Sequence, residues 1–476
     1  MIFSSLFFLL FFLPLFLLLY FLVQGEKKQN IVLLIFSLVF YCWGGVRYVV
    51  LLAAMVFAAW LFGRLIENAR TRKTQKILLA VSVAIFLAVL GFFKYTGFFL
   101  SIFGGLPGSD SPAFQIALPL GISFYTFKLI SYVADVYHSR IRAEKSYLML
   151  LTYTSMFHHA VAGPIVRYST VQKELRHRKY RYGDIADGIC RCCVGVAKKA
   201  ILADHCGALA EQLLPVAGDI ASVPASAVWL GSIFYMLQLY LDFSAYSDIA
   251  IGLGRICGFH FEENFNYPYM AVSVKDFWRR WHISLSSFFR DYVYIPLGGS
   301  RVSKRRLILN LLVVWALTGF WHGASWNYIL WGLFFFAFIV LQNFWTERGM
   351  PSIPKILAHA GTLFIVFIGW IMFRFESFPQ LGMALKGLFG LNGNPAGGST
   401  VSITLVNNIF FLILAVLACT PLLSMLLKWP DRMTAKGDVR PQYVYIIRIA
   451  IAAALFVLAV IALVGNSYSP FLYYQF

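Results

Sequence analysis

Charged side chains are scarce in this chain of 476 residues. Only 13% of the residues are Asp, Glu, Lys or Arg, whereas 60% are hydrophobic and 17% are aromatic. A soluble globular domain carries about 25% charged residues, which help to cover its surface. The composition therefore excludes an ordinary soluble protein and indicates an integral membrane protein, and we expect one polytopic domain over residues 1–476.

Several sequence motifs of soluble enzymes are also missing. The chain contains no G-x-S-x-G elbow, no P-loop and no G-x-G-x-x-G fingerprint, so a serine nucleophile, ATP hydrolysis and nicotinamide chemistry lack support. Its seven cysteines include one CxxC pair, Cys190 and Cys193, with no second pair at metal-site spacing. Neither a disulfide framework nor a zinc site is indicated, and no bound metal is expected.

Acidic residues are outnumbered by basic ones, 21 to 40, which gives a formal net charge of +19. In a membrane protein such an excess collects in cytoplasmic loops, where it sets the orientation of the spans. Basic loops also attract anionic lipid headgroups and phosphorylated substrates. We therefore expect the membrane, and not nucleic acid, as the partner of this charge.

Long apolar runs recur along the chain and predict an all-α protein with about 11 to 13 transmembrane helices. The first run, residues 6–23, lacks the features of a cleaved signal peptide and is expected to remain as a span. The basic loops 64–76 and 428–440 are placed in the cytoplasm, and the loop 105–111, without a basic residue, outside. The other expected spans are residues 31–43, 49–62, 77–93, 117–136, 185–203, 307–317, 328–341, 356–373, 403–427 and 444–464.

Two apolar segments do not fit simple spans. Residues 147–166 lie between two basic loops, 138–145 and 167–181. Both ends of this segment are therefore expected on the cytoplasmic side, and we predict that it is re-entrant or lies in the membrane plane. Residues 228–257 are long and polar in their second half, and we expect them to enter the membrane and turn inside the protein.

The stretch 318–326 (TGFWHGASW) places His322, preceded by the aromatic Trp321, between two apolar runs. An ionisable group at membrane depth is unfavourable unless it lines a cavity or has a partner, so it is a functional candidate by default. A neutral imidazole can take a proton from a hydroxyl, because its ordinary pKa lies near physiological pH. The alternative, a histidine that only hydrogen-bonds between helices, stays open.

A second histidine, His282, ends the basic and aromatic segment 278–282 (WRRWH). On a helix, Trp278, Trp281 and His282 share one face, whereas Arg279 and Arg280 point elsewhere. This pattern fits an interfacial helix whose arginines and tryptophans bind an anionic ligand while His282 faces a tunnel. The alternative is a membrane anchor whose Trp and Arg side chains contact lipid.

Two carboxylates stand in the apolar stretch 238–248 (QLYLDFSAYSD). Asp242 with Tyr246, and Ser244 with Asp248, are i, i+4 pairs on separate helix faces. Buried polar groups of this kind orient other residues or cap a broken helix. We therefore expect a supporting role for Asp242, Asp248 and Tyr246, and no direct chemistry.

Taken together, these motifs resemble the membrane-bound O-acyltransferase family, and most closely its bacterial alginate O-acetyltransferase branch. The resemblance rests on residues 239–254 (LYLDFSAYSDIAIGLG), 277–290 (FWRRWHISLSSFFR), 291–299 (DYVYIPLGG) and 320–323 (FWHG), with further likeness at 118–125, 162–167 and 264–268. It extends over most of the chain. It implies a fold of peripheral helices around a thin core of tilted and re-entrant segments, with a tunnel joining the two membrane faces.

The resemblance also implies roles for the two histidines. The catalytic histidine of the family's WHG-type motif maps onto His322, and the histidine of the WRRWH segment maps onto His282. A thioester donor, acetyl-CoA or else an acyl carrier protein, would enter from the cytoplasm, and His322 would remove the proton from an acceptor hydroxyl. His282 would orient the donor or polarise its carbonyl. We expect Arg279, Arg280 and the basic residues 301–306 to bind the donor's phosphates.

This branch supplies acetyl groups to exopolysaccharides outside the cell, often together with an extracytoplasmic SGNH-type esterase-like protein. The chain contains no such soluble domain, so the resemblance implies a separate SGNH-type partner, a polysaccharide acceptor and a location in the bacterial cytoplasmic (inner) membrane. D-alanyl transfer from a carrier-protein thioester to teichoic acid is the nearest alternative. A transporter or scaffold of a polymer synthase, which would not need His322, is a further one.

Overall fold

The computed structural model describes residues 3–102, 117–181, 183–427 and 441–465. Within these ranges the regular structure is helical and contains no strand, which confirms the predicted all-α fold. The α-helices are α1 (Leu13–Leu22), α2 (Glu26–Cys42), α3 (Val46–Asn68), α4 (Arg72–Ile102), α5 (Ile122–Tyr137), α6 (Tyr147–Ser155), α7 (Tyr168–Val171), α8 (Asp184–Ala197), α9 (Asp204–Leu213), α10 (Ala225–Ile256), α11 (Val274–Arg280), α12 (Ile283–Phe289), α13 (Lys304–His322), α14 (Trp326–Glu347), α15 (Lys355–Arg374), α16 (Phe378–Leu388), α17 (Ser399–Ala418), α18 (Leu422–Leu427) and α20 (Pro441–Gly465).

Six of the described helices are long and apolar enough to cross a membrane. They are α3, α4, α14, α15, α17 and α20. This finding confirms a multi-pass membrane protein. The other helices are shorter or more polar, so the count of about 11 to 13 spans stays a prediction, and the loops 105–111 and 428–440 lie outside the described residues.

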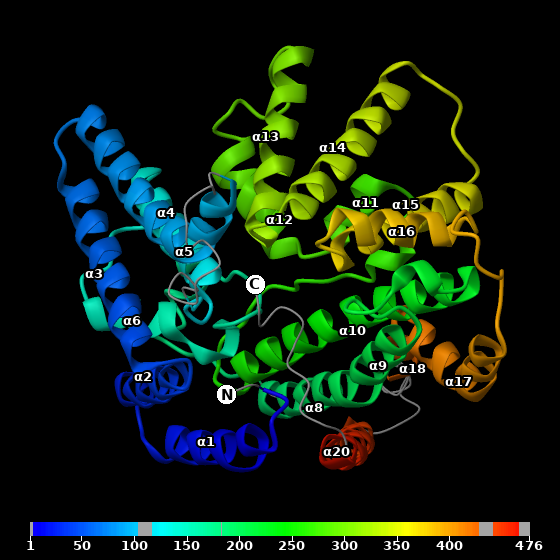
Figure 1. Ribbon diagram of the computed structural model, residues 1–476. Helices are drawn as coiled ribbons and strands as arrows, with labels where there is room; N and C mark the ends of the chain where they lie inside the picture. Colours follow the sequence, from blue (N-terminus) through cyan, green and yellow to red (C-terminus); the bar gives the residue numbers. More distant parts are fainter. Residues whose placement is uncertain (1–2, 103–116, 182, 428–440, 466–476) are drawn as a thin grey trace.

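The helices form groups that are easily followed in Figure 1. Helices α3, α4 and α5 pack side by side at the left, and α13 and α14 stand in the upper half and converge toward the centre. Helices α8, α9 and α10 lie together in the lower half of the view, with α20 against α8. The segment with α11 and α12 lies between the upper and lower groups.

Two helices form the buried core, and most of the others expose apolar side chains. Of the 16 residues of α5, 15 are buried, and of the 32 residues of α10, 24 are buried, including polar ones. In contrast, α17 exposes 85% of Phe410 and 70% of Val406, and α3 exposes 67% of Val50. Contiguous exposed apolar surface of this kind indicates contact with lipid. The core is therefore surrounded by peripheral helices, as the family resemblance implies.

The segment 147–166 is interrupted, as expected. Helix α6 ends at Ser155, a short 3-10 turn (Phe157–His159) follows, and the chain then continues without regular structure. Side chains from three other elements accept hydrogen bonds from its backbone: Ser37 from Phe157 N (3.2 Å), Tyr246 from Val161 N (3.3 Å) and Ser284 from Ile165 N (3.0 Å). These bonds replace the helical ones that the interruption removes. The cytoplasmic placement of both ends stays a prediction.

The expectation that residues 228–257 turn inside the protein is wrong. Helix α10 is continuous over 32 residues. Its carboxylates do not require a turn, because lysines of the neighbouring π-helical turn Lys198–Ala203 pair with them. This turn joins α8 to α9, so the helical run predicted at 185–203 extends to Leu213.

Two further differences concern the C-terminal third. The predicted span 403–427 is divided into α17 and α18 at residues 419–421, where Pro421 lacks the amide hydrogen that a continuing helix requires. Helix α16 was not expected from the sequence, because its eleven residues are too few for a span.

Candidate active site

Helices α13 and α14 cross at glycines, which brings their backbones into contact near His322. A Cβ on Gly319 would lie 2.3 Å from the carbonyl oxygen of Tyr328, and one on Gly332 would lie 2.4 Å from that of Trp315. A Cβ on Gly323 would lie 2.2 Å from the Tyr328 ring. No side chain fits at such separations, so the glycines of the 318–326 stretch fix the close crossing of the two helices.

His322 is the last residue of α13 and is 1% exposed. Its ring lies 4.9 Å from that of Trp321, 5.0 Å from that of Trp331 on α14 and 5.3 Å from that of Phe373 on α15, measured between ring centroids. The aromatic walls predicted from the sequence are thus present, and three helices contribute to them. Packing from three sides fixes the orientation of the imidazole.

Helix α4 caps the end of α13 with two hydrogen-bond donors. Lys94 Nζ donates to the carbonyl oxygen of Trp321 (2.5 Å), and the Tyr95 hydroxyl donates to that of Phe320 (2.6 Å). These carbonyls belong to the last helical turn, which lacks intrahelical donors and carries the negative end of the helix dipole. Neither residue was predicted from the sequence, although a lysine directly after the apolar run 77–93 indicates a buried cation that needs a partner.

His282 lies between α11 and α12 and is also 1% exposed. Its backbone has φ +44°, a left-handed conformation that few residues other than glycine adopt. The imidazole packs edge-on against Phe243 of α10 at 4.8 Å, and its Nδ1 lies 3.2 Å from Oδ1 of Asn264. His282 is therefore placed by contacts from α10 and from the loop that follows it.

Trp321 connects the two histidines. Its ring centroid lies 4.9 Å from that of His322 and 5.9 Å from that of His282. The two candidates, 40 positions apart in the chain, thus contact the same indole. The structure brings together the residues of the 320–323 and 278–282 motifs.

Trp278 and Trp281 belong to a buried aromatic cluster. Trp278 packs against Trp315, Trp331 and Phe335, and Trp281 packs against Trp370. Both are less than 10% exposed, at 8% and 1%. In the described structure they support the walls of the histidine site, and their expected contact with a donor stays a prediction.

Arg279 and Arg280 differ in their surroundings. Arg280 Nε donates to Asp276 Oδ1 over 2.9 Å, an ion pair within α11. Arg279 is exposed, and no ion pair of its guanidinium is found with the described residues. Of the two, Arg279 is therefore the better placed to bind an anionic ligand.

The basic residues 301–306 lie at the opposite end of α13 from His322. Arg301, Lys304, Arg305 and Arg306 are exposed, and Lys304 pairs with Glu347 of α14 over 2.8 Å. From Lys304 to His322 there are 18 residue steps, or about 27 Å at about 1.5 Å per residue. The cluster is thus separated from His322 by nearly the whole length of the helix.

Asp242 and Asp248 take part in two ion networks between α10 and the turn 198–203. Lys199 Nζ lies 2.7 Å from Asp242 Oδ1, and Lys198 Nζ lies 2.6 Å from Asp248 Oδ2. Asp248 also accepts from Arg191 of α8 over 3.0 Å. Neither lysine was predicted as a partner from the sequence, because i, i+4 spacing relates residues of one helix only.

Tyr246 contacts the interrupted segment and the N-terminal Phe3. Its hydroxyl accepts from Val161 N, and its ring stacks on Phe3 at 4.7 Å. These contacts help to hold the segment 147–166 against α10. The supporting role expected of Tyr246, Asp242 and Asp248 stays a prediction as far as the chemistry is concerned.

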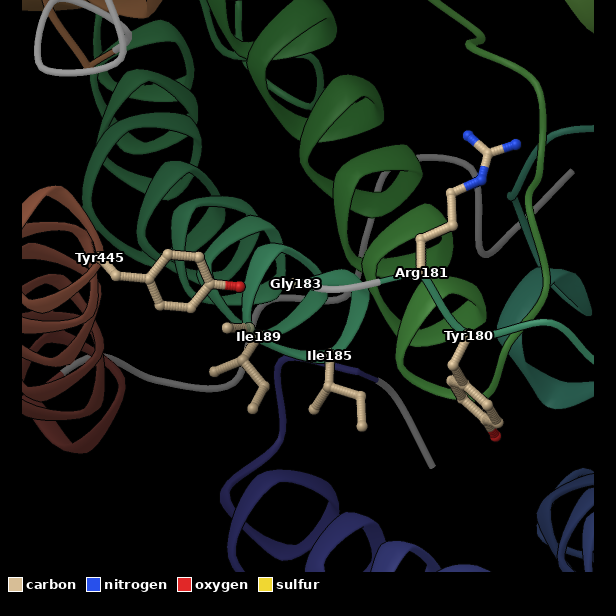
Figure 2. A pocket seen from close by; sticks show the side chains of 7 residues that line it. Tyr180, Arg181, Gly183, Ile185, Ile189 and Tyr445 are labelled. Atoms are coloured by element: carbon tan, nitrogen blue, oxygen red, sulfur yellow. The ribbon is translucent and has the colours of Figure 1, made fainter. Parts of the chain in front are cut away.

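A surface pocket of about 280 Å³ lies elsewhere, between the start of α8 and α20. Figure 2 shows Ile185, Ile189 and the Tyr445 ring facing it, with Gly183 beside the tyrosine hydroxyl and the Arg181 guanidinium directed away. It shares no residue with the histidine site. In the described part of the chain, no three His, Cys, Asp or Glu side chains are grouped as metal ligands.

Comparison with known proteins shows which family the chain is similar to. The family model of the membrane-bound O-acyltransferases matches residues 139–378, a range that includes both histidines. The chain is 39% identical to the probable alginate O-acetylase AlgI of Pseudomonas aeruginosa over 390 residues, which covers 79% of this chain and 72% of the relative.

Two other relatives carry related names. The peptidoglycan O-acetyltransferase of Helicobacter pylori is 33% identical over 427 residues, covering 83% of this chain and 80% of the relative. The teichoic acid D-alanyltransferase of Bacillus subtilis is 29% identical over 294 residues, covering 57% of this chain and 72% of the relative. The chain therefore belongs to the membrane-bound O-acyltransferase family, and it is an O-acyltransferase.

Proposed function

We propose that this protein transfers an acetyl group from a cytoplasmic thioester donor to a hydroxyl on the extracytoplasmic side of the bacterial cytoplasmic membrane, for the O-acetylation of an exopolysaccharide. The observation that carries the proposal is the pair of buried histidines, His322 and His282, in contact with one indole. The names of the relatives, which include alginate and peptidoglycan O-acetyltransferases, support acetyl transfer to a polymer.

The chemistry follows from the properties of an imidazole in an aromatic site. His322 removes the proton from the acceptor hydroxyl, and the hydroxyl oxygen attacks the thioester carbonyl carbon. The carbon–sulfur bond breaks, and the imidazolium returns the proton to the departing thiolate. General base catalysis of this kind contributes about 10²- to 10⁴-fold to the rate. His282 orients one of the reactants beside His322.

Acetyl-CoA is the proposed donor, because its phosphates match the exposed basic residues. Arg279 stands three positions before His282 and is closer to the site along the chain than residues 301–306. A guanidinium can bind phosphate oxygens in a bidentate manner. We therefore assign Arg279 to the donor's phosphates, with residues 301–306 attracting the donor from the cytoplasm.

A separate SGNH-type protein is the proposed extracytoplasmic partner, and a polysaccharide is the final acceptor. Many of the exposed side chains on the described helices are large and apolar, as expected of surfaces that face lipid. A soluble partner would supply the surface that recognises the polymer.

The experiment is an acyl-transfer assay on the purified full-length protein with radiolabelled acetyl-CoA and free-thiol detection. His322→Ala should lower thiol release at least about 100-fold, as expected for the loss of a general base. His359→Ala is the matched control, because His359 is half-buried on α15 and contacts the Ala271 carbonyl instead of the site. Equal thiol release by His322→Ala and the wild type would refute the role of His322. No thiol release by either protein, with any donor, would refute acyl transfer and favour a transporter or scaffold.

The donor is tested in the same assay with alanyl carrier protein in place of acetyl-CoA. Thiol release with acetyl-CoA alone supports acetyl transfer. Thiol release with the carrier protein alone would show D-alanyl transfer, the activity named for the Bacillus subtilis relative.

A further inference from the structure

Asn264 is a fully buried residue that lies in the loop after α10 and contacts His282. Its side-chain oxygen Oδ1 accepts from the backbone N of Ser284 (3.1 Å) and from the Ser284 hydroxyl (2.8 Å), and it lies 3.2 Å from His282 Nδ1. Its Nδ2 donates to Ser247 Oγ of α10 over 3.3 Å. All of its side-chain polar atoms are thus engaged.

The backbone of the same residue helps to fix the turn at His282. The carbonyl oxygen of Asn264 accepts from Ile283 N over 2.9 Å, and Asn266 N donates to the carbonyl oxygen of Arg280 over 3.0 Å. A left-handed conformation in a residue other than glycine persists only where the surroundings hold it. These bonds on both sides of His282, together with that from Ser284 N to Asn264 Oδ1, hold its φ of +44°.

The orientation of the Asn264 amide follows from its neighbours. A backbone N–H can only donate, so the atom facing Ser284 N must be the oxygen Oδ1 and not the NH₂ group. The NH₂ group then faces the Ser247 hydroxyl, which can accept. Both contacts require the same amide orientation, and the oxygen therefore faces His282.

The Asn264 oxygen in turn determines the protonation of His282. An amide oxygen has no proton, so the imidazole nitrogen 3.2 Å from it must carry one. The Ser284 hydroxyl does not supply that proton, because it lies closer to Asn264 Oδ1 (2.8 Å) than to His282 Nδ1 (3.4 Å). It also accepts from Ile165 N. In the neutral ring the other nitrogen, Nε2, then carries a lone pair.

Nε2 of His282 is the ring nitrogen that can contact a bound reactant. It is buried, and no hydrogen-bond partner for it is found among the described residues. A buried acceptor without a partner is unfavourable, so such an atom in a candidate site indicates where a reactant can bind.

We infer that Asn264 is a positioning residue that holds His282 as the Nδ1–H tautomer, so that its bare Nε2 accepts a hydrogen bond from a hydroxyl or amide proton of a bound reactant. This inference rests on the proposed acyl transfer and specifies the role of His282 in it. A neutral His282 in this tautomer cannot donate to a thioester carbonyl from Nε2. It acts as a hydrogen-bond acceptor beside His322 and does not polarise the carbonyl.

The first experiment replaces the amide with a carboxylate. Asn264→Asp keeps an acceptor next to Nδ1 but adds a negative charge, and an opposite charge within about 4 to 6 Å favours the protonated imidazole by about 1 to 3 pH units. The acidic limb of the pH–rate profile should move up by that amount. The other titratable groups near the site, His322 and Lys94, are unchanged in this variant.

A second measurement does not depend on acyl transfer. Deuterium exchange at the imidazole Cε1–H, followed by mass spectrometry on the full chain in detergent over a pH series, reports the protonation midpoint of each histidine. The midpoint of His282 should rise in Asn264→Asp by about 1 to 3 pH units. Asn310→Asp is the matched control, because Asn310 is equally buried but donates to the carbonyls of Leu297 and Gly299, and it should leave His282 unchanged.

The outcomes separate this inference from the proposed function. An unchanged His282 midpoint in Asn264→Asp would overturn the assignment of Asn264, whatever the activity. A shifted midpoint in a protein that does not transfer acetyl groups would support the assignment and overturn the proposed function.

Two substitutions at His282 provide a test if Asn264→Asp does not fold. The amide NH₂ of Asn reaches the place of Nδ1, and that of Gln reaches the place of Nε2. His282→Asn should therefore keep the bond to Asn264 and the melting temperature while losing activity at least about 100-fold. His282→Gln should lose the bond to Asn264 as well as activity, and its melting temperature should fall. A stable His282→Gln with a destabilised His282→Asn would overturn the inference.

Discussion

Replacing Lys199 with methionine should destabilise the protein strongly, because it removes the cation from a buried ion network. Lys199 Nζ lies 2.7 Å from Asp204 Oδ1 and 2.7 Å from Asp242 Oδ1, and the side chains of Lys199 and Asp242 are 2% and 1% exposed. Removing one member of a buried pair costs about 3 to 5 kcal/mol, since the remaining charge stays buried without its partner.

The matched control is the same substitution in an exposed pair. Lys304 lies 2.8 Å from Glu347, at almost the same distance, but the two side chains are 76% and 38% exposed. Such a surface pair contributes about 0 to 1 kcal/mol. Lys199→Met should therefore lose about 2 to 5 kcal/mol more than Lys304→Met.

The assay is thermal unfolding of the detergent-solubilised protein, followed by tryptophan fluorescence. With an unfolding entropy of about 2.1 cal/mol/K per residue, a loss of 1 kcal/mol lowers the melting temperature of a chain of 476 residues by about 1 °C. Lys199→Met should therefore melt about 2 to 5 °C below Lys304→Met. Adding Asp204→Asn and Asp242→Asn to Lys199→Met should restore most of this loss, because no unpaired charge then remains. Equal melting temperatures of Lys199→Met and Lys304→Met would refute the reasoning.

The other predictions concern the helix crossing and the donor. Gly319→Ala should lower the melting temperature and should lower activity at least about tenfold, since its Cβ would lie 2.3 Å from the carbonyl oxygen of Tyr328. The control Gly91→Ala, with open space around its Cβ, should do neither; equal effects would contradict the crossing. Arg279→Gln should raise the KM for acetyl-CoA about tenfold with little change in kcat, and Arg280→Gln, paired with Asp276, should raise it less; a larger effect of Arg280→Gln would exclude the assignment.

The fold class was predictable from the sequence because it depends on local signals. Apolar runs predicted the helices, and the 318–326 stretch marked His322 as a candidate site residue, which stays a prediction. The interruption at residues 147–166 was also predictable, since the two basic flanks are visible in the sequence. In each of these cases the decisive residues are neighbours in the chain.

Pairing between distant segments was not predictable in the same way. The polar second half of residues 228–257 led to the expectation of a turn, which is absent. Lys199, 43 positions before Asp242, pairs with this carboxylate from the turn Lys198–Ala203. Lys94 lies more than 200 positions from the Trp321 carbonyl that it caps. Periodicity within one helix carries no information about such partners.

The supports of the two histidines differ in kind, which has a consequence for how the site tolerates substitution. His322 ends a 19-residue helix and is held by rings of α14 and α15 and by the cap from α4. His282 lies on a turn between two seven-residue helices and depends on Asn264 for its backbone and its tautomer. Because reacting groups must lie within about 3 to 3.5 Å of one another, the relative position of the histidines is most sensitive to the loop after α10. Substitutions in that loop should therefore lower activity, although the loop lies far from His322 along the chain.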